Sequence, residues 1–182
     1  MEPDARAGLA ALWAELSQLE APITELFVLA VATTRKPTPA QQRQLAQGHR
    51  RIVRKRAEIE SASLSLLKLP LLPARAIHQV ACAIEIAAEL ERIAYLLRHM
   101  VRSPLLTHGS TSQQAGAALA TALTASQECV ALVLSGLAAH DTNNHPPLLT
   151  AHGRAEAQFA LVYNWMADDS TRAAARPICA GN

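Results

Sequence analysis

The chain has 182 residues, of which 50% are hydrophobic and only 3% are aromatic, and its formal net charge is +2. This length allows one domain or two small repeats, and a core so poor in aromatic residues must be built from Leu, Ile, Val and Ala, as in closely packed helices. The amino terminus lacks the pattern of a signal peptide and the longest apolar run, residues 26–32, is too short to span a bilayer, so we expect a soluble, cytoplasmic protein that is peripheral to a membrane at most.

The first predicted helix covers Asp4 to Thr33. Its apolar residues recur every three or four positions and form one continuous stripe: Leu9, Leu12, Leu16, Leu19, Ile23, Leu26 and Ala30. Pro22 lies in the middle of this stripe. Because proline lacks the backbone donor and its ring collides with the preceding turn, we expect a kink at this point.

The second predicted helix begins after a turn at residues 35–39 and runs to about Leu67. Thr38 can cap this helix, and Pro39 can take its first position, where no backbone donor is needed. Apolar residues then follow seven positions apart: Leu45, Ile52, Ile59 and Leu66. This spacing gives the helix one buried face.

Three more helices are predicted, at Ala74 to about Arg102, about Ser112 to Ala138, and Leu149 to about Met166. On the last two, the residues expected to face inward are Gly116, Leu119, Leu123, Ser126, Val130, Val133, Leu137, Ala155, Phe159, Val162 and Met166. Long helices with short loops predict an all-α fold, an antiparallel bundle of about five long helices. Residues 1–103 would form one unit and residues 104–182 a second, shorter one.

Glu91 interrupts an apolar face of the third predicted helix. It continues the line of Ile77 and Ile84 at seven-residue spacing, so we expect it to face a neighbouring helix. A carboxylate in such a place needs a partner, since burying it unpaired is costly. Arg56 on the second helix can supply a guanidinium. An interhelical ion pair is therefore the favoured interpretation, with a solvent-exposed or metal-binding Glu91 as alternatives.

The stretch from Ala81 to Val101 reads ACAIEIAAELERIAYLLRHMV and contains the hexapeptide Ala-Glu-Leu-Glu-Arg-Ile. This hexapeptide resembles the signature helix of the PhoU family, the phosphate-signalling adaptors of bacteria, in which the motif reads Leu-Glu-Arg-Ile-Gly-Asp. The resemblance extends from Gly48 to Ile93, which follow the family's second and third helices, and includes residues 155–172, which resemble its fifth. It implies a PhoU-like fold with a complete three-helix repeat and a second repeat that lacks its last helix.

In the PhoU family, two acids of the motif lie four residues apart on one helix face and share a metal ion with acids of neighbouring helices. Here the first acid is Glu91, Tyr95 stands in place of the second, and His99 replaces the following Asn. The positions that match the other acids hold His49, Val53, Leu148 and His152. The resemblance therefore implies that most of the site is lost and that no cofactor is bound. The alternative is a histidine-modified site of Glu91, His49 and His99 for a transition metal.

The second predicted helix carries a basic ridge, which consists of Arg50, Arg51, Arg54 and Lys55. One interpretation is a solvated helix face partly balanced by Glu58 and Glu60. The other is a partner-binding surface for an anionic partner, which could be an acidic protein, a membrane surface or nucleic acid. Nucleic acid is the weakest of these, because the net charge is only +2 and no reading head is visible.

Signatures of catalysis are missing from the sequence. It contains no GxxxxGK[ST], GxSxG or kinase motif, and its three cysteines form no CxxC pair. We therefore expect that the protein is not an enzyme. The resemblance implies an adaptor between a phosphate ABC transporter and a sensor histidine kinase, which would regulate phosphate uptake and phosphate homeostasis. The groove left open by the absent helix predicts a homodimer, which Val133→Glu or Phe159→Glu should dissociate or unfold.

Overall fold

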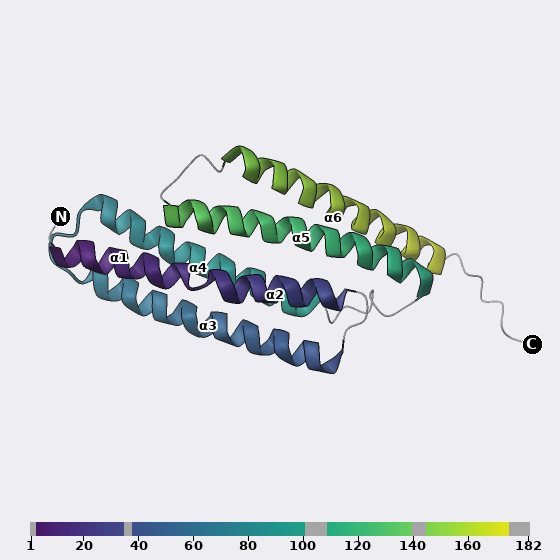
Figure 1. The fold of residues 1–182 in the computed structure, drawn as a ribbon, viewed down its shortest axis with the longest axis horizontal. Helices are drawn as coiled ribbons and strands as arrows, with labels where there is room; N and C mark the ends of the chain where they lie inside the picture. Colours follow the sequence, from purple (N-terminus) through teal and green to yellow (C-terminus); the bar gives the residue numbers. More distant parts are fainter. Residues whose placement is uncertain (1–2, 35–37, 101–108, 140–144, 175–182) are drawn as a thin grey trace, which may run out of the picture.

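The computed structural model describes the backbone of residues 3–34, 38–100, 109–139 and 145–174, and the side chains of residues 4–34, 38–100, 116–137 and 146–164. The elements follow in the order α1 (Pro3–Ser17), α2 (Glu20–Thr33), α3 (Pro39–Leu67), α4 (Ala74–Met100), α5 (Gly109–Ala139) and α6 (His145–Ala174). They run alternately up and down in a bundle, with α1 and α2 nearly end to end as one rod (Figure 1). The predicted all-α fold of about five long helices is confirmed.

The first rod is divided at Gln18 and Leu19, which separate α1 from α2. Leu19 donates its amide to the carbonyl of Leu16 at 3.0 Å, so the end of α1 tightens into a shorter turn. Pro22 lies in the first turn of α2, where a missing backbone donor costs little. The helix is therefore interrupted about one turn before Pro22, because in a continuous helix the proline ring would collide with the carbonyl group four residues earlier.

The predicted start of the second predicted helix, which is α3, is confirmed. Thr38 caps α3 with its hydroxyl, which accepts from the amide of Gln41 at 3.2 Å, while the amide of Thr38 donates to the side chain of Gln41 at 3.0 Å. Pro39 takes the first helical position. This reciprocal capping box satisfies two backbone amide donors that would otherwise lack partners, and it fixes the point where α3 begins.

The other predicted boundaries are near the observed ones, with α6 the largest difference. It begins at His145, four residues before the predicted start at Leu149, and ends at Ala174, eight residues after the predicted end at Met166. Pro146 and Pro147 are therefore inside the first turn of α6 instead of in the preceding loop. Proline is tolerated there because the first amides of a helix have no intrahelical partner.

The core lies where α3 and α4 meet the first rod. Its largest fully buried side chains include Leu12, Leu16, Leu19, Ile23, Leu26, Leu45, Ile52 and Ile59. From α4 the buried line is formed mainly by small residues: Ala76, Val80, Ala83, Ala87, Leu90, Ala94 and Leu97. Ile77, predicted to face inward, is 47% exposed. Alanine allows α4 to approach its neighbours closely, and the bulkier Ile77 lies one position beside that line.

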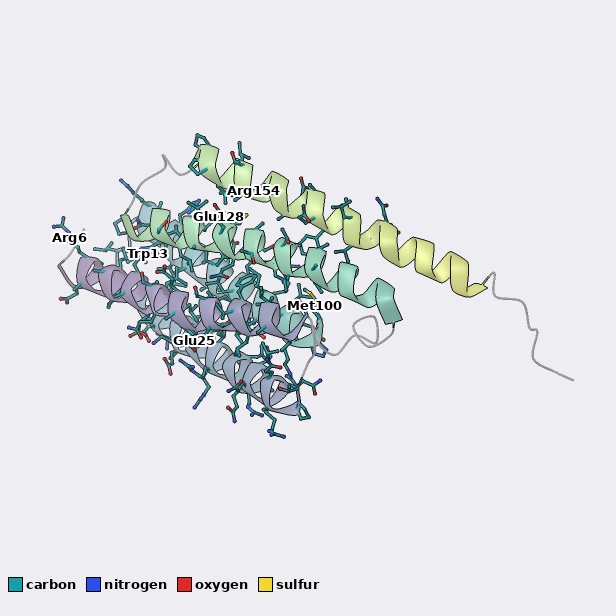
Figure 2. All side chains as sticks on the ribbon, turned by 45° about the vertical axis from the view of Figure 1, so that its right-hand side comes forward. Arg6, Trp13, Glu25, Met100, Glu128 and Arg154 are labelled. Atoms are coloured by element: carbon teal, nitrogen blue, oxygen red, sulfur yellow. The ribbon has the colours of Figure 1, made fainter. Side chains whose placement is uncertain are left out.

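The hairpin of α5 and α6 packs on the bundle mainly through contact of α5 with α2. Gly116 is required at this contact, because a Cβ atom there would lie 2.8 Å from the carbonyl oxygen of Thr34. Glu128 on α5 accepts from Arg154 on α6 at 2.6 Å and ties the two helices together (Figure 2). The predicted boundary between residues 103 and 104 lies outside the described residues.

Two helical stretches in the described part of the chain, Asp4–Thr33 and Gly116–Leu137, are long and apolar enough to cross a bilayer. Both also contribute buried side chains to the bundle, such as Leu12 and Leu123. A helix buried in a protein core can pass the same test of length and composition, so the two stretches do not by themselves indicate a membrane-spanning helix.

Candidate functional site

Glu91 faces α3 across the seam between α3 and α4. Its side chain is 23% exposed and accepts a hydrogen bond from Nη1 of Arg56. Arg56 also contacts Oε1 of Glu60, on its own helix, at 2.8 Å. The hydrogen bond to Glu91, followed by that to Glu60, raises the pKa of Arg56 above its ordinary value. The predicted interhelical ion pair between Arg56 and Glu91 is therefore confirmed.

His49 lies on α3 in the same seam and is buried. Its Nδ1 atom is 3.4 Å from Nη1 of Arg98, and its Nε2 atom is 3.7 Å from Oε1 of Glu91. Because a guanidinium only donates hydrogen bonds, Nδ1 is the acceptor and the ring proton of neutral His49 is on Nε2, which is buried and has no hydrogen-bond partner among the described residues. Burial lowers the pKa of His49, as do the charges of Arg98 and His99, while Glu91 partly offsets the decrease. The imidazole is therefore held in its neutral form at neutral pH.

Tyr95 lies between the two histidines of the predicted metal set. Its ring centroid is 4.1 Å from that of His99 and 6.1 Å from that of His49, which it meets edge-on. The structure therefore brings His49 and Glu91 together but places His99 against Tyr95. Val53 is the other α3 residue at a position that the PhoU resemblance matches to an acid, and it is 39% exposed. His152 on α6 forms an exposed pair with a glutamate of its own helix instead.

The donor set in this seam does not fit a metal ion. A transition metal needs three or four His, Cys, Asp or Glu ligands around one point, and no such group occurs among the described residues. Two guanidiniums, those of Arg56 and Arg98, contact the two candidate ligands instead. The seam is thus a polar cluster in which the charges compensate one another within the protein.

The basic ridge is divided between paired and unpaired cations. Arg51 donates to Glu25 of α2 at 3.0 Å. Lys55 donates to Glu15 of α1 and to Glu58, the latter at 3.1 Å, and the hydrogen bond to Glu15 is the largest cause that raises the pKa of Lys55. The predicted balance by Glu58 is confirmed for Lys55 alone. Glu60 pairs with Arg56 instead, and Arg51 pairs with an acid of the first rod that the sequence did not indicate.

Arg50 and Arg54, the other two members of the ridge, are exposed. Within the described ranges, neither makes an ion pair with an acid. Sequence periodicity places all four cations on the outer side of α3, and only the position of α1 and α2 against α3 separates the two classes. Of the four partner-binding candidates, these two keep their charge unpaired within the described residues.

A second surface, which sequence reasoning predicted only in outline, is an apolar groove between α4, α5 and α6. It encloses about 370 Å³, and its walls include Leu97, Met100, Leu123 and Phe159. Phe159, which was predicted to line an open groove, does so and is 40% exposed. Val133 was predicted on the same inward face but is 40% exposed, while its neighbour Leu134 is buried.

Cys82 and Cys129 are free thiols that are partly buried. Sγ of Cys82 is 3.2 Å from Nδ1 of His78, one turn earlier on the outer side of α4. The four-residue spacing of this pair could have been read from the sequence. Cys129 lines the apolar groove, and burial raises the pKa of its thiol, as does nearby Glu128. A thiol with a raised pKa is a poor nucleophile, so Cys129 acts as an apolar wall residue.

The chain was compared with families, curated proteins and solved structures, and no match was found. The PhoU resemblance therefore rests on the residues quoted above, of which the hexapeptide from Ala88 to Ile93 lies in the middle of α4.

Proposed function

We propose that this protein is a non-enzymatic regulator of phosphate uptake and phosphate-starvation signalling. It acts as a cytoplasmic protein-protein adaptor between a phosphate transporter and a sensor histidine kinase. The observation that carries the proposal is the position of Glu91. Glu91, which matches the first acid of the family motif, faces the neighbouring helix α3, as the corresponding family acid would, but Arg56 neutralises it.

This substitution of an ion pair for a metal site favours binding over chemistry. Glu91 is held by Arg56, and His49 is held neutral between Arg98 and Glu91, so neither group is free to activate a substrate. What the molecule offers to others lies on its surface. It has unpaired arginines on α3 and an apolar groove of about 370 Å³ between α4, α5 and α6. Exposed surfaces of these two kinds are typical of protein-protein recognition.

The decisive experiment is deletion of the gene in its native host. In phosphate-rich medium, the deletion strain should express a phosphate-starvation reporter and take up more phosphate than the parent strain. The intact gene supplied on a plasmid should restore repression. Transporter or kinase subunits should co-purify with the tagged protein from phosphate-rich cells. An unchanged reporter together with no phosphate-system subunit in the purified material would refute the proposal.

A point substitution in the groove separates the adaptor role from the stability of the fold. Leu96 on α4 is 49% exposed beside the groove, so Leu96→Glu should weaken the groove as a binding surface without opening the core. Leu64→Glu is the matched control, because Leu64 is 57% exposed on α3. If the groove is an adaptor surface, reporter repression should be lost in the first variant and kept in the second.

A further inference from the structure

The outer side of α3 carries a row of four exposed residues, three of which are arginines without an ion-pair partner among the described residues. It consists of Arg43, Gln47, Arg50 and Arg54, and we call it the arginine row. Their positions follow the three-four spacing of a single helix face. No ion pair to any of the three arginines occurs among the described residues. Glu58, four residues after Arg54, is already held by Lys55 at 3.1 Å.

The remaining cations of this part of α3 are all used inside the molecule. Arg51, Lys55 and Arg56 pair with acids of α2, α1 and α4, respectively. Although the net charge of the chain is low, positive and negative charges are separated locally around α3. The acids that pair with α3 lie on its side that faces the bundle. Arg50 and Arg54 lie one turn apart, where like charges repel. An external anion would relieve that repulsion.

The row lines part of a shallow, open hollow between side chains of α3 itself, which consists of Gln47, Arg50, Arg51, Val53 and Arg54. Val53 is 39% exposed at this place, so the hollow combines guanidiniums with one apolar side chain. The helices that α3 packs against are α1, α2 and α4, and α3 forms the outer edge of the bundle (Figure 1). Among the described elements, no helix covers the arginine row.

We propose that the arginine row binds an acidic α-helix of a partner protein. With a rise of 1.5 Å per residue, Arg50 and Arg54 lie about 6 Å apart along the axis, and Arg43 and Arg54 about 16 Å apart. Carboxylates at three- and four-residue intervals on a facing helix have the same spacing, and each can accept two hydrogen bonds from a guanidinium. One apolar residue of the partner covers Val53. This inference rests on the adaptor role proposed above, because it names the chemistry of the partner.

The shape and composition of the row favour a helix over a membrane or a nucleic acid. The row is straight and one helix wide, which matches the ridge of a single packed helix. Helices that lie on membranes combine their cations with Trp, Phe or Leu that insert among the lipids, and the row has no such residue. Three arginines would neutralise few phosphates of a nucleic acid. Both alternatives are outcomes of the experiment below.

The test uses the full chain in its native host, with a photo-crosslinking amino acid in place of Gln47. This residue is uncharged and lies within the row. We expect crosslinks to a protein segment whose acids recur every three or four residues. The variant R50E/R54E should reduce the yield of crosslinked product about tenfold or more, because the two facing surfaces would then both be negatively charged and would repel each other.

Two controls separate this surface from general effects of charge. The variant R6E/R75E changes the net charge equally through exposed arginines of α1 and α4, and it should keep the crosslink. The crosslinker placed at Thr121, exposed on α5, sets the background. Circular dichroism of each purified variant confirms that the helices are intact.

The inference is overturned by crosslinks to lipid or nucleic acid, by a protein crosslink that R50E/R54E leaves unchanged, or by a yield at Gln47 no higher than at Thr121. Its failure is distinguishable from failure of the proposed function. A charge-dependent crosslink to an acidic helix outside the phosphate system would support the arginine row and reject the phosphate role. Derepression of the reporter on deletion, with no such crosslink, would do the reverse.

Discussion

The substitution Glu91→Ala tests the charge compensation in the seam between α3 and α4. It removes the acceptor of Arg56 and the carboxylate 3.7 Å from Nε2 of His49. A hydrogen bond to a charged group in a half-buried place contributes about 1 to 3 kcal/mol. Arg56 is 35% exposed and keeps Glu60 as a second acceptor at 2.8 Å. We therefore expect a loss of about 1 to 2 kcal/mol in the free energy of unfolding, the lower half of that range.

The measurement is urea unfolding followed by far-ultraviolet circular dichroism. The midpoint should decrease while the dependence on urea concentration stays the same, which shows that stability and not compactness has changed. Glu58→Ala is the matched control. Glu58 contacts Lys55, but Lys55 keeps Glu15 as a partner and the Glu58 side chain is 63% exposed. Its removal should cost less than about 0.5 kcal/mol.

A double-mutant cycle then assigns the effect to the pair. Arg56→Gln and Glu91→Gln, alone and together, should give a coupling free energy of about 0.5 to 1.5 kcal/mol. Equal small losses at Glu91 and Glu58, or a coupling of zero, would show that the Glu91 carboxylate is solvated. The reasoning that derives a compensated seam from its geometry would then be wrong.

Four other predictions concern metal content, protonation, helix contact and assembly. Elemental analysis of the purified protein should find no stoichiometric iron, zinc or manganese; one firmly held ion per chain would contradict this. Burial and a neighbouring guanidinium lower the pKa of His49 below 6.5, so the stability that its neutral form contributes is complete above about pH 6.5 and is lost as the pH decreases. The difference in unfolding free energy between the wild type and His49→Gln should therefore shrink from about pH 7 to about pH 5, and a constant difference would reject it. In thermal unfolding, Gly116→Ala should destabilise by about 1 to 3 kcal/mol through collision with a backbone carbonyl, whereas Gly153→Ala, with no atom within 4 Å of its new Cβ, should stabilise by about 0.5 to 1 kcal/mol; the same sign at both sites would refute the close contact. Sedimentation should show a homodimer that Phe159→Glu or Val133→Glu dissociates or unfolds, since both residues are 40% exposed, and a wild-type monomer at micromolar concentration would contradict this.

Much of the fold could be predicted because its signals are local. The Thr38 cap and the seven-residue spacing from Leu45 onward determine where α3 begins and which face it buries. The effect of Pro22 was predictable, but the exact position of the break depends on which carbonyl its ring would strike. Ile77 was misplaced because size was taken as the sign of burial, whereas α4 buries alanines that allow close approach.

The candidate site was predictable where it depends on one pair of helices. Seven-residue spacing placed Glu91 opposite α3, and Arg56 was the available cation. The partners of Arg51 and Lys55 could not be found in this way, because they depend on how the first rod is set along α3. Local sequence carries no record of that relative position. The separation of paired from unpaired arginines is therefore a property of the tertiary structure alone.

The break between α1 and α2 has a mechanical consequence. Glu15 lies before it and Glu25 after it, and they contact Lys55 and Arg51, which are four residues apart on the continuous helix α3. The unbroken helix α3 is thus joined by an ion pair to the helix on each side of the break. Any motion that changes the angle between α1 and α2 must break one of these contacts or drag α3 along. Salt should weaken both contacts, of which the Arg51–Glu25 pair is more than half exposed, and should therefore loosen the attachment of the two short helices to α3.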